Sequence, residues 1–251
     1  MDDVLVSPGK FIEYMCTLNK WTLDEVSFPP LTVMALPAFM PLFQEKLCTE
    51  KVEKSLIKNH LIIKGKEACL IEARVGCPCI ALDLEIIITL GGSHFIHVGF
   101  AGGLHTDMNP GDIIITRGAL NETGIPSLYG VFDPLIPSDP LLTEALITVA
   151  QKEGIHVRSG IHWCTDAPYR ETKKKLIAYT RMRALCVEME GSALFAVSKF
   201  YGKHAAAVYV VSDIITEKGW HQAWHSEEIK HGCTKAVTIV NSFLQDHGQK
   251  C

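Results

Sequence analysis

The chain contains 251 residues, of which 47% are hydrophobic and 21% charged, and its formal charge is −4. That size allows a substantial core in one large domain or two small ones, and the lack of any basic stripe argues against nucleic acid as a partner. No apolar run reaches the ~18 residues that a membrane span needs, and the N-terminal sequence MDDVLVSPGKF has no apolar signal-peptide core. We therefore expect a cytoplasmic protein without a membrane partner.

Strand-length apolar runs alternate with helix-length amphipathic segments along the chain. Strands are predicted at 31–37, 61–65, 68–76, 95–99, 112–120, 155–163, 184–189 and 205–213. Helices are predicted at 38–48, 78–90, 141–153, 171–180, 191–202 and in the C-terminal segment, whose apolar stripe is Ile229, Cys233, Ala236, Val240 and Phe243. No linker or repeat interrupts this alternation. We predict a single α/β domain over residues 1–251, with a central mixed sheet flanked by helices.

The nine cysteines bear on compartment and on metal binding. Several lie inside apolar strand-like runs, which is typical of reduced, buried thiols. The nearest approach to a metal motif is Cys77-Pro78-Cys79, whose one-residue spacing and lack of a second pair do not fit a zinc site. No metal is expected.

Three predicted strands end in residues that can carry chemistry. Ligands of open α/β sheets bind beyond the C-terminal ends of the strands, and here those ends read GFAGG, EMEG and SD. The glycines at 99, 102 and 103 either allow a ligand to approach the backbone or only permit a tight turn.

Glu190 and Asp213 each allow two interpretations. Glu190, between a strand and a helix, can accept hydrogen bonds from a ribose diol or serve as an acid favoured by the helix dipole. Asp213 follows a very apolar strand, so desolvation can raise its pKa and make it a general acid, or it can simply cap the strand. Taken singly, neither residue decides the function.

The ordered motifs VGFAGGL, NPGDIIITRGAL, TDAPYRET, CVEMEGSALFAV and VVSD together are more informative. This set resembles the nucleoside phosphorylase family, which includes uridine phosphorylase, hexameric purine nucleoside phosphorylase and methylthioadenosine/S-adenosylhomocysteine nucleosidase. The resemblance runs from about Arg74 to the end of the chain and is greatest to a uridine phosphorylase-like branch. It implies a nucleoside phosphorylase-like fold.

The resemblance also implies roles for individual residues. Asp213 would protonate the leaving purine at N7. The ribose would lie against Glu188, Met189 and Glu190. The base pocket would be formed by Tyr169, Arg170, Ala101, Gly102 and Ser212, with Ser212 orienting the acid. No metal or organic cofactor is implied, inorganic phosphate is the co-substrate, and the family leads us to expect a homo-oligomer, either a dimer or a hexamer.

The phosphate site departs from the family pattern. The N-terminal GDPxR-like element is absent, and His97 and Phe100 stand where the family has an arginine and a threonine or serine. The phosphate-binding candidates are therefore Arg74, Gly99, His97 and Arg117. The alternatives are exposed edge-strand arginines and a plain buried histidine.

The motifs favour a nucleoside phosphorylase that leans toward purines and releases free base and ribose 1-phosphate. Three alternatives stay open: a phosphate-independent nucleosidase, a uridine phosphorylase, and a nucleoside-binding protein without turnover. Trp220 and Trp224 either cover the base as a lid or pack at the start of the last helix.

Overall fold

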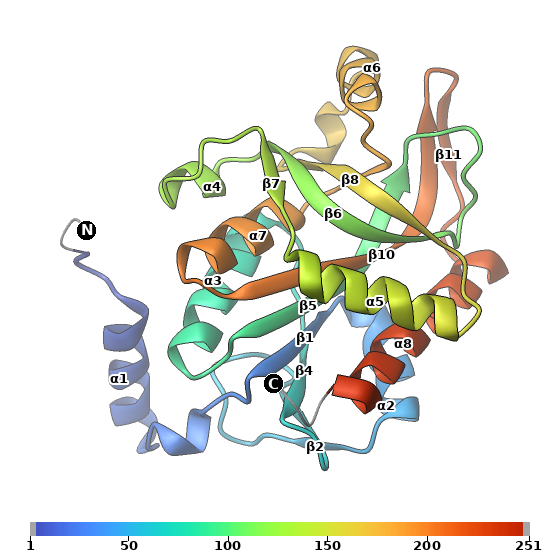
Figure 1. Ribbon diagram of the computed structural model, residues 1–251. Coiled ribbons are helices and arrows are strands. Elements are labelled where there is room, and N and C mark those ends of the chain that lie inside the picture. Colours follow the sequence, from blue (N-terminus) through green and yellow to red (C-terminus); the bar gives the residue numbers. More distant parts are fainter. Residues whose placement is uncertain (1–3, 248–251) are drawn as a thin grey trace.

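The computed structural model describes residues 4–247. Its strands form one mixed sheet in the order β11-β10-β6-β8-β9-β5-β1-β4-β3-β2, with β7 paired to β6 (Figure 1). The strands are β1 (Leu31–Ala35), β2 (Thr49–Lys51), β3 (Leu61–Ile63), β4 (Ala68–Glu72), β5 (His94–Gly103), β6 (Ile113–Glu122), β7 (Leu135–Pro137), β8 (Val157–Thr165), β9 (Cys186–Glu188), β10 (His204–Thr216) and β11 (Gly219–Gln222).

Helices surround this sheet. They are α1 (Pro8–Asn19), α2 (Met40–Lys46), α3 (Cys77–Thr89), α4 (Ile125–Leu128), α5 (Pro140–Lys152), α6 (Lys173–Arg181), α7 (Gly191–Phe200) and α8 (Glu227–His247), with short 3-10 turns η1 (Asp24–Val26), η2 (Pro37–Phe39) and η3 (Pro168–Arg170). Ser7, Asp139 and Thr172 each accept a hydrogen bond from a backbone N–H in the first turn of the helix that follows. These side chains satisfy donors that have no partner within the helix, so they fix where α1, α5 and α6 begin.

Five of the strands close into a ring. β10 pairs in parallel with β5 and antiparallel with β6, and β6–β8, β8–β9 and β9–β5 complete the circuit. From β5 the sheet continues outward through β1, β4, β3 and β2. Side chains that point into the ring are enclosed by backbone, so the polar ones among them need partners inside the protein.

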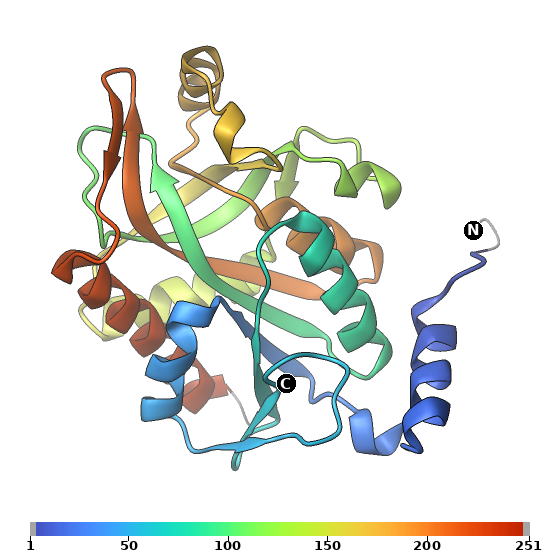
Figure 2. The same cartoon turned by 180° about the vertical axis from the view of Figure 1, so that it is seen from behind.

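Helices cover the sheet on two sides. α3 packs against α7 on one side, and α5 and α8 pack together on the other (Figures 1 and 2). All five members of the apolar stripe predicted for the last helix are buried in α8. β1 is buried along its whole length, which explains its continuous apolar sequence. The predicted α/β architecture with a central mixed sheet flanked by helices is confirmed.

Several predicted strand ends differ from the structure by a few residues, and two of these differences bear on the site. β5 continues to Gly103 instead of stopping at 99, and β10 continues past Asp213 to Thr216. The two strands pair with each other along this stretch, and β10 then turns back into β11. The ladder hydrogen bonds therefore extend both strands beyond the end of their apolar sequence. The glycines of GFAGG and the Ser-Asp pair lie inside strands rather than in loops.

Across residues 4–247, no helix combines the length and apolarity that crossing a bilayer requires. In the same part of the chain the cysteines are all free, and six of the eight are buried. This agrees with the expectation of reduced, buried thiols.

Candidate active site

The EMEG sequence forms the turn between β9 and α7. Glu188 is the last residue of β9, and its Oε2 accepts the backbone N–H groups of Glu190 and Gly191, both at 2.8 Å. The first N–H groups of a helix have no partner within the helix, and a carboxylate there is also favoured by the helix dipole. Glu188 therefore caps α7. Its side chain is fully buried and faces the interior of the ring, where its Oε1 lies 2.9 Å from His162 Nε2.

Glu190 connects the start of α7 to the start of α3. The residue is only 3% exposed, and its Oε1 accepts the backbone N–H of Gly76 at 2.6 Å. Gly76 has φ +97°, a conformation that favours glycine, and it immediately precedes α3. Burial raises the pKa of Glu190, and the nearby Glu188 raises it further. A carboxyl group held at two helix starts is suited to bind hydroxyl groups.

Asp213 lies at a bulge in β10. In the pairing with β5, Val211 faces Ala101 and Asp213 faces Gly102, so Ser212 is an extra residue. A bulge redirects the side chains next to it. Here it lets the Ser212 hydroxyl donate to Asp213 Oδ1 at 2.6 Å.

A second donor reaches Asp213 from the β11 hairpin. Trp220 Nε1–H donates to Asp213 Oδ2 at 2.7 Å, although Trp220 is 58% exposed. The predicted alternatives for Trp220, a lid or packing, did not include this contact. Trp224 packs edge-on against Phe100.

Gly102 brings the two acidic segments together. It pairs with Asp213 across β5–β10 and with Val187 across β5–β9. A Cβ at Gly102 would lie 3.2 Å from Asp213 Oδ2 and 3.4 Å from Val187 Cγ1, closer than most such contacts. Ile215 Cδ1 would lie closer still, at 2.8 Å, so glycine at position 102 allows Asp213, Ile215 and Val187, the residue before the EMEG segment, to pack against one another. Next to it, the Ala101 carbonyl accepts a long hydrogen bond from Ser212.

Glu171 is a further acid near Asp213 that the sequence analysis did not identify. It lies half-buried just before α6. Burial raises its pKa to about 7, and the charges of Asp213 and Glu122 act in the same direction, opposed by Lys175. The sequence around Glu171 is polar and helix-like, so only the folding of this loop over β10 reveals the proximity.

The TDAPYRET segment is on the surface in this structure. Tyr169 is 93% exposed and Arg170 is exposed, and both lie in η3. Both side chains therefore face solvent, and a role for them in base binding stays a prediction. Met189, the predicted platform for the ribose, is half-buried.

The predicted phosphate-binding side chains do not converge. Arg74 pairs with Asp83 of α3. Arg117 is the extra residue of a bulge in β6, which turns its side chain outward to Glu144 of α5 at 2.6 Å. Both arginines thus form ion pairs with neighbouring carboxylates, and they lie in different parts of the structure, Arg74 just before α3 and Arg117 in β6.

His97 has a different environment from that of a phosphate ligand. It is fully buried and burial lowers its pKa to about 4, so the ring is neutral at pH 7. Gly99 makes room for it, since a Cβ there would lie 2.8 Å from the ring. A neutral imidazole does not supply the positive charge that a phosphate dianion needs.

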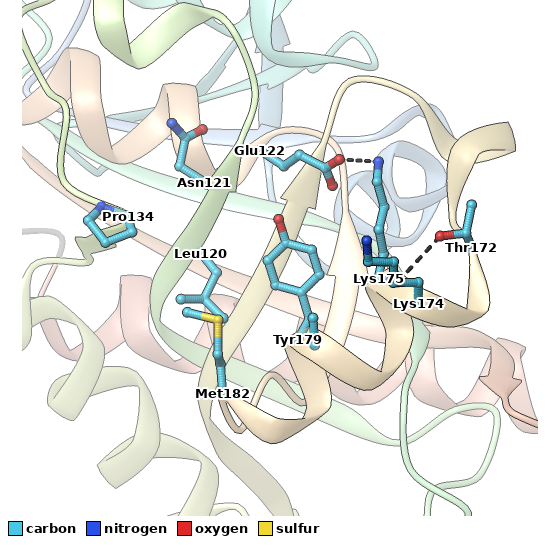
Figure 3. Close-up of a pocket in the computed structure, with 10 residues that line it drawn as sticks. Leu120, Asn121, Glu122, Pro134, Thr172, Lys174, Lys175, Tyr179 and Met182 are labelled. Atoms are coloured by element: carbon cyan, nitrogen blue, oxygen red, sulfur yellow. Dashed lines mark hydrogen bonds and ion pairs between the residues drawn. The ribbon is translucent and has the colours of Figure 1, made fainter.

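A cavity of about 550 Å³ lies beside this site, between the end of β6 and α6 (Figure 3). Leu120, Tyr179 and Met182 give it apolar walls, and the Glu122–Lys175 ion pair lies at its edge. Neither Asp213 nor Glu190 lines it. Glu122 also accepts a hydrogen bond from Trp163 at 2.7 Å. Within residues 4–247, no group of three or more His, Cys, Asp or Glu side chains is placed to hold a metal ion.

Comparison with known families agrees with this geometry. Residues 34–245 match the family described as the phosphorylase superfamily. The chain belongs to this superfamily, and the resemblance inferred from the motifs is confirmed.

Individual relatives share less than a third of their aligned residues with this chain. The guanosine phosphorylase of Halorubrum lacusprofundi is 29% identical over 148 residues, which cover 59% of this chain and 61% of that protein. A DeoD-type purine nucleoside phosphorylase of Shewanella loihica is 28% identical over 183 residues, or 70% of this chain and 78% of the relative. The chain thus matches less than two thirds of the length of the guanosine phosphorylase.

Among solved structures, the purine nucleoside phosphorylase of Toxoplasma gondii in complex with immucillin-H superimposes with a TM-score of 0.77. The superposition covers 89% of this chain and 92% of that chain at 19% identity. The nucleoside phosphorylase-like fold predicted from the motifs is confirmed by this match.

Proposed function

We propose that the protein is a nucleoside phosphorylase that cleaves the N-glycosidic bond of purine nucleosides with inorganic phosphate. The observation that carries this proposal is the placement of Asp213, which accepts a hydrogen bond from Ser212 and pairs across β5 with Gly102, whose other partner, Val187, directly precedes the EMEG segment. The names of the relatives, guanosine phosphorylase and purine nucleoside phosphorylase, support the preference for purines. The reaction needs no cofactor beyond the phosphate co-substrate.

In the proposed reaction, Asp213 acts as the general acid. Breaking the bond from C1′ to the base nitrogen leaves the electron pair on the base, and the Asp213 proton moves to N7 of the purine. A phosphate oxygen then forms the new bond to C1′ and gives ribose 1-phosphate. Neutralising the leaving group as its charge develops contributes about 10²–10⁴-fold to the rate.

Glu190 has a separate task, since its carboxyl group binds the ribose hydroxyls and fixes the sugar. Holding C1′ between the acid and the nucleophile is an orientation effect. The indole N–H of Trp220 is hydrogen-bonded to Asp213 Oδ2, the carboxylate oxygen that lies beside Gly102. A base that binds at this oxygen therefore displaces the indole N–H.

A second candidate, hydrolysis by water, is favoured by one observation. Arg74 and Arg117 are paired elsewhere, and His97 is neutral, so none of the predicted side chains offers free positive charge for phosphate. For phosphorolysis, other residues of this chain or residues of a neighbouring subunit then have to bind the phosphate. The latter agrees with the proposed homo-oligomer, a dimer or a hexamer, which we place in the cytoplasm.

The deciding experiment measures release of free base from guanosine, inosine and uridine, with and without inorganic phosphate. We expect release from the purine nucleosides that depends on phosphate. Release without phosphate identifies a nucleosidase, and preferential release of uracil identifies a uridine phosphorylase. Binding without any release identifies a nucleoside-binding protein and contradicts the proposal.

The role of Asp213 is tested by Asp213→Asn, which keeps the shape of the side chain but cannot donate the acidic proton. Turnover of purine nucleosides should fall by about 10²–10⁴-fold, while their dissociation constants stay within a few-fold. Asp107→Asn, which removes a surface carboxylate paired with Arg158, is the matched control and should leave turnover unchanged. Full activity of Asp213→Asn would contradict the assignment.

A further inference from the structure

The interior of the strand ring holds a group of polar side chains, one each from β6, β8, β9 and β10. Thr116 Oγ1 lies 2.6 Å from His162 Nδ1. His162 Nε2 lies 2.9 Å from Glu188 Oε1, an ion-pair distance without the alignment of a hydrogen bond. Tyr209 donates its hydroxyl to Glu188 Oε2 at 2.9 Å. All four residues are at least 96% buried.

A buried carboxylate is costly unless it is paired and hydrogen-bonded. Burial alone would raise the pKa of Glu188, but His162 and the donated hydrogen bonds outweigh it and lower the pKa. Glu188 is therefore held as an ionised group. The same carboxylate caps the Glu190–Gly191 backbone, so the ring interior is mechanically connected to Glu190.

The packing around Gly191 shows how closely these groups approach the turn. A Cβ at Gly191 would collide with the His162 ring and lie 3.0 Å from the Tyr209 hydroxyl. The two ring-interior side chains thus pack directly against the first residue of α7. They therefore lie against the segment that carries Glu190.

We propose that His162 and Tyr209 are positioning residues for sugar recognition, which act by holding Glu188 and, through it, the backbone of Glu190. This inference rests on the proposed function, in which Glu190 binds the ribose hydroxyls. Neither positioning residue touches the substrate. Their effect reaches the sugar through the two backbone hydrogen bonds to Glu188 Oε2.

The test variant is Tyr209→Phe, which removes only the hydroxyl. Its matched control is Tyr129→Phe, because Tyr129 also donates its hydroxyl to a glutamate, Glu85, at 2.8 Å, but between α4 and α3. Amide hydrogen exchange of Glu190 and Gly191 is measured first, since it needs no turnover. Loss of one hydrogen bond to the cap should speed their exchange about fivefold in Tyr209→Phe and leave it unchanged in the control.

The second measurement compares kcat/KM for a ribonucleoside and its 2′,3′-dideoxy analogue. A positioning role lowers kcat/KM for the ribonucleoside selectively, so the preference for ribose hydroxyls falls about fivefold in Tyr209→Phe. Combining Tyr209→Phe with Glu190→Gln should add no further loss, because the hydroxyl acts through Glu190. An equal loss on both substrates overturns the inference.

A variant of His162 keeps the inference testable if Tyr209→Phe folds poorly. His162→Gln keeps a polar side chain beside Glu188 Oε1 and should preserve more of the ribose preference than His162→Leu. Equal exchange rates at Glu190 and Gly191 in wild type and Tyr209→Phe would overturn the proposal. If the wild-type protein cleaves no nucleoside, the proposed function fails, while amide exchange still decides the positioning role.

Discussion

Three carboxyl groups at the candidate site differ because of their surroundings. Glu188 is ionised inside the ring, where backbone N–H groups and the Tyr209 hydroxyl donate to it. Glu190, two residues later in the β9–α7 turn, has a raised pKa. Glu171, half-buried near Asp213 and Glu122, has a pKa of about 7. Environment, rather than residue type, thus separates the protonation states, and such separation is characteristic of functional sites.

The raised pKa of Glu171 predicts a pH-dependent contribution to stability. The folded state favours the protonated form, so stability is present below the pKa of the unfolded chain and is lost as pH rises through about 7. Glu171→Gln stays neutral and escapes this loss. We expect the variant to gain about 1–2 kcal/mol over wild type between pH 5 and pH 8.5, after allowance for solvent screening.

Urea denaturation of both proteins at the two pH values measures this difference. Glu13→Gln, which alters an exposed glutamate of α1, is the control. The same difference between Glu171→Gln and wild type at pH 5 and pH 8.5 would show that Glu171 is not buried near other acids.

At the level of elements, the β9–α7 turn depends on glycine at its first helical position. Gly191 is the point where α7 meets the His162 ring and the Tyr209 hydroxyl. α7 is buried from Gly191 to Ser198, so the helix cannot shift outward to relieve a collision. The turn that presents Glu190 is therefore sterically fixed.

Gly191→Ala should destabilise the protein by about 1–3 kcal/mol, the usual cost of overpacking a core. Gly9→Ala is a matched control in the first turn of α1, because a Cβ at Gly9 has nothing within 4 Å. There the better helix propensity of alanine should stabilise the protein by at most about 1 kcal/mol. Free energies of unfolding from urea titrations check both, and similar values for the two variants would contradict the steric argument.

At the level of the whole molecule, one side of the structure exposes apolar side chains. α1 lies at the periphery, packed on α3 (Figures 1 and 2). Phe11, Tyr14 and Leu18 of α1 are 42–64% exposed, and Leu82 of α3 is 51% exposed. Phe11 and Leu82 line the same groove. Exposed apolar surface of this kind is typical of contacts between subunits.

We therefore expect the protein to be an oligomer in solution, with a mass of at least twice the 27.8 kDa of one chain. Leu82→Asp should lower the measured mass, because a charge buried in an apolar interface lacks a partner. Leu141→Asp, at an exposed position at the start of α5, is the control. Sedimentation equilibrium measures the mass of the wild type and of both variants. A monomeric wild type would show that a neighbouring subunit cannot supply phosphate ligands.

Much of the architecture could be predicted from local patterns. Burial requires apolar residues at regular spacing, so the sequence predicts β1 and β10 from their apolar runs and α8 from its apolar stripe. The EMEG sequence forms the strand-to-helix turn that its pattern predicts. In contrast, the ends of β5 and β10 were misplaced, since ladder pairing with a distant strand extends a strand without leaving any local signal.

The sequence by itself determined the α/β class, the superfamily motifs and the candidate acids Glu190 and Asp213, because these depend on residue type and order along the chain. Only the tertiary structure decided that Glu188 turns inward to His162 and Tyr209, that Glu171 lies near Asp213, and that Arg74 and Arg117 pair elsewhere. The physical reason is that charge pairing and burial depend on distances between residues far apart in sequence, and ring closure sets those distances.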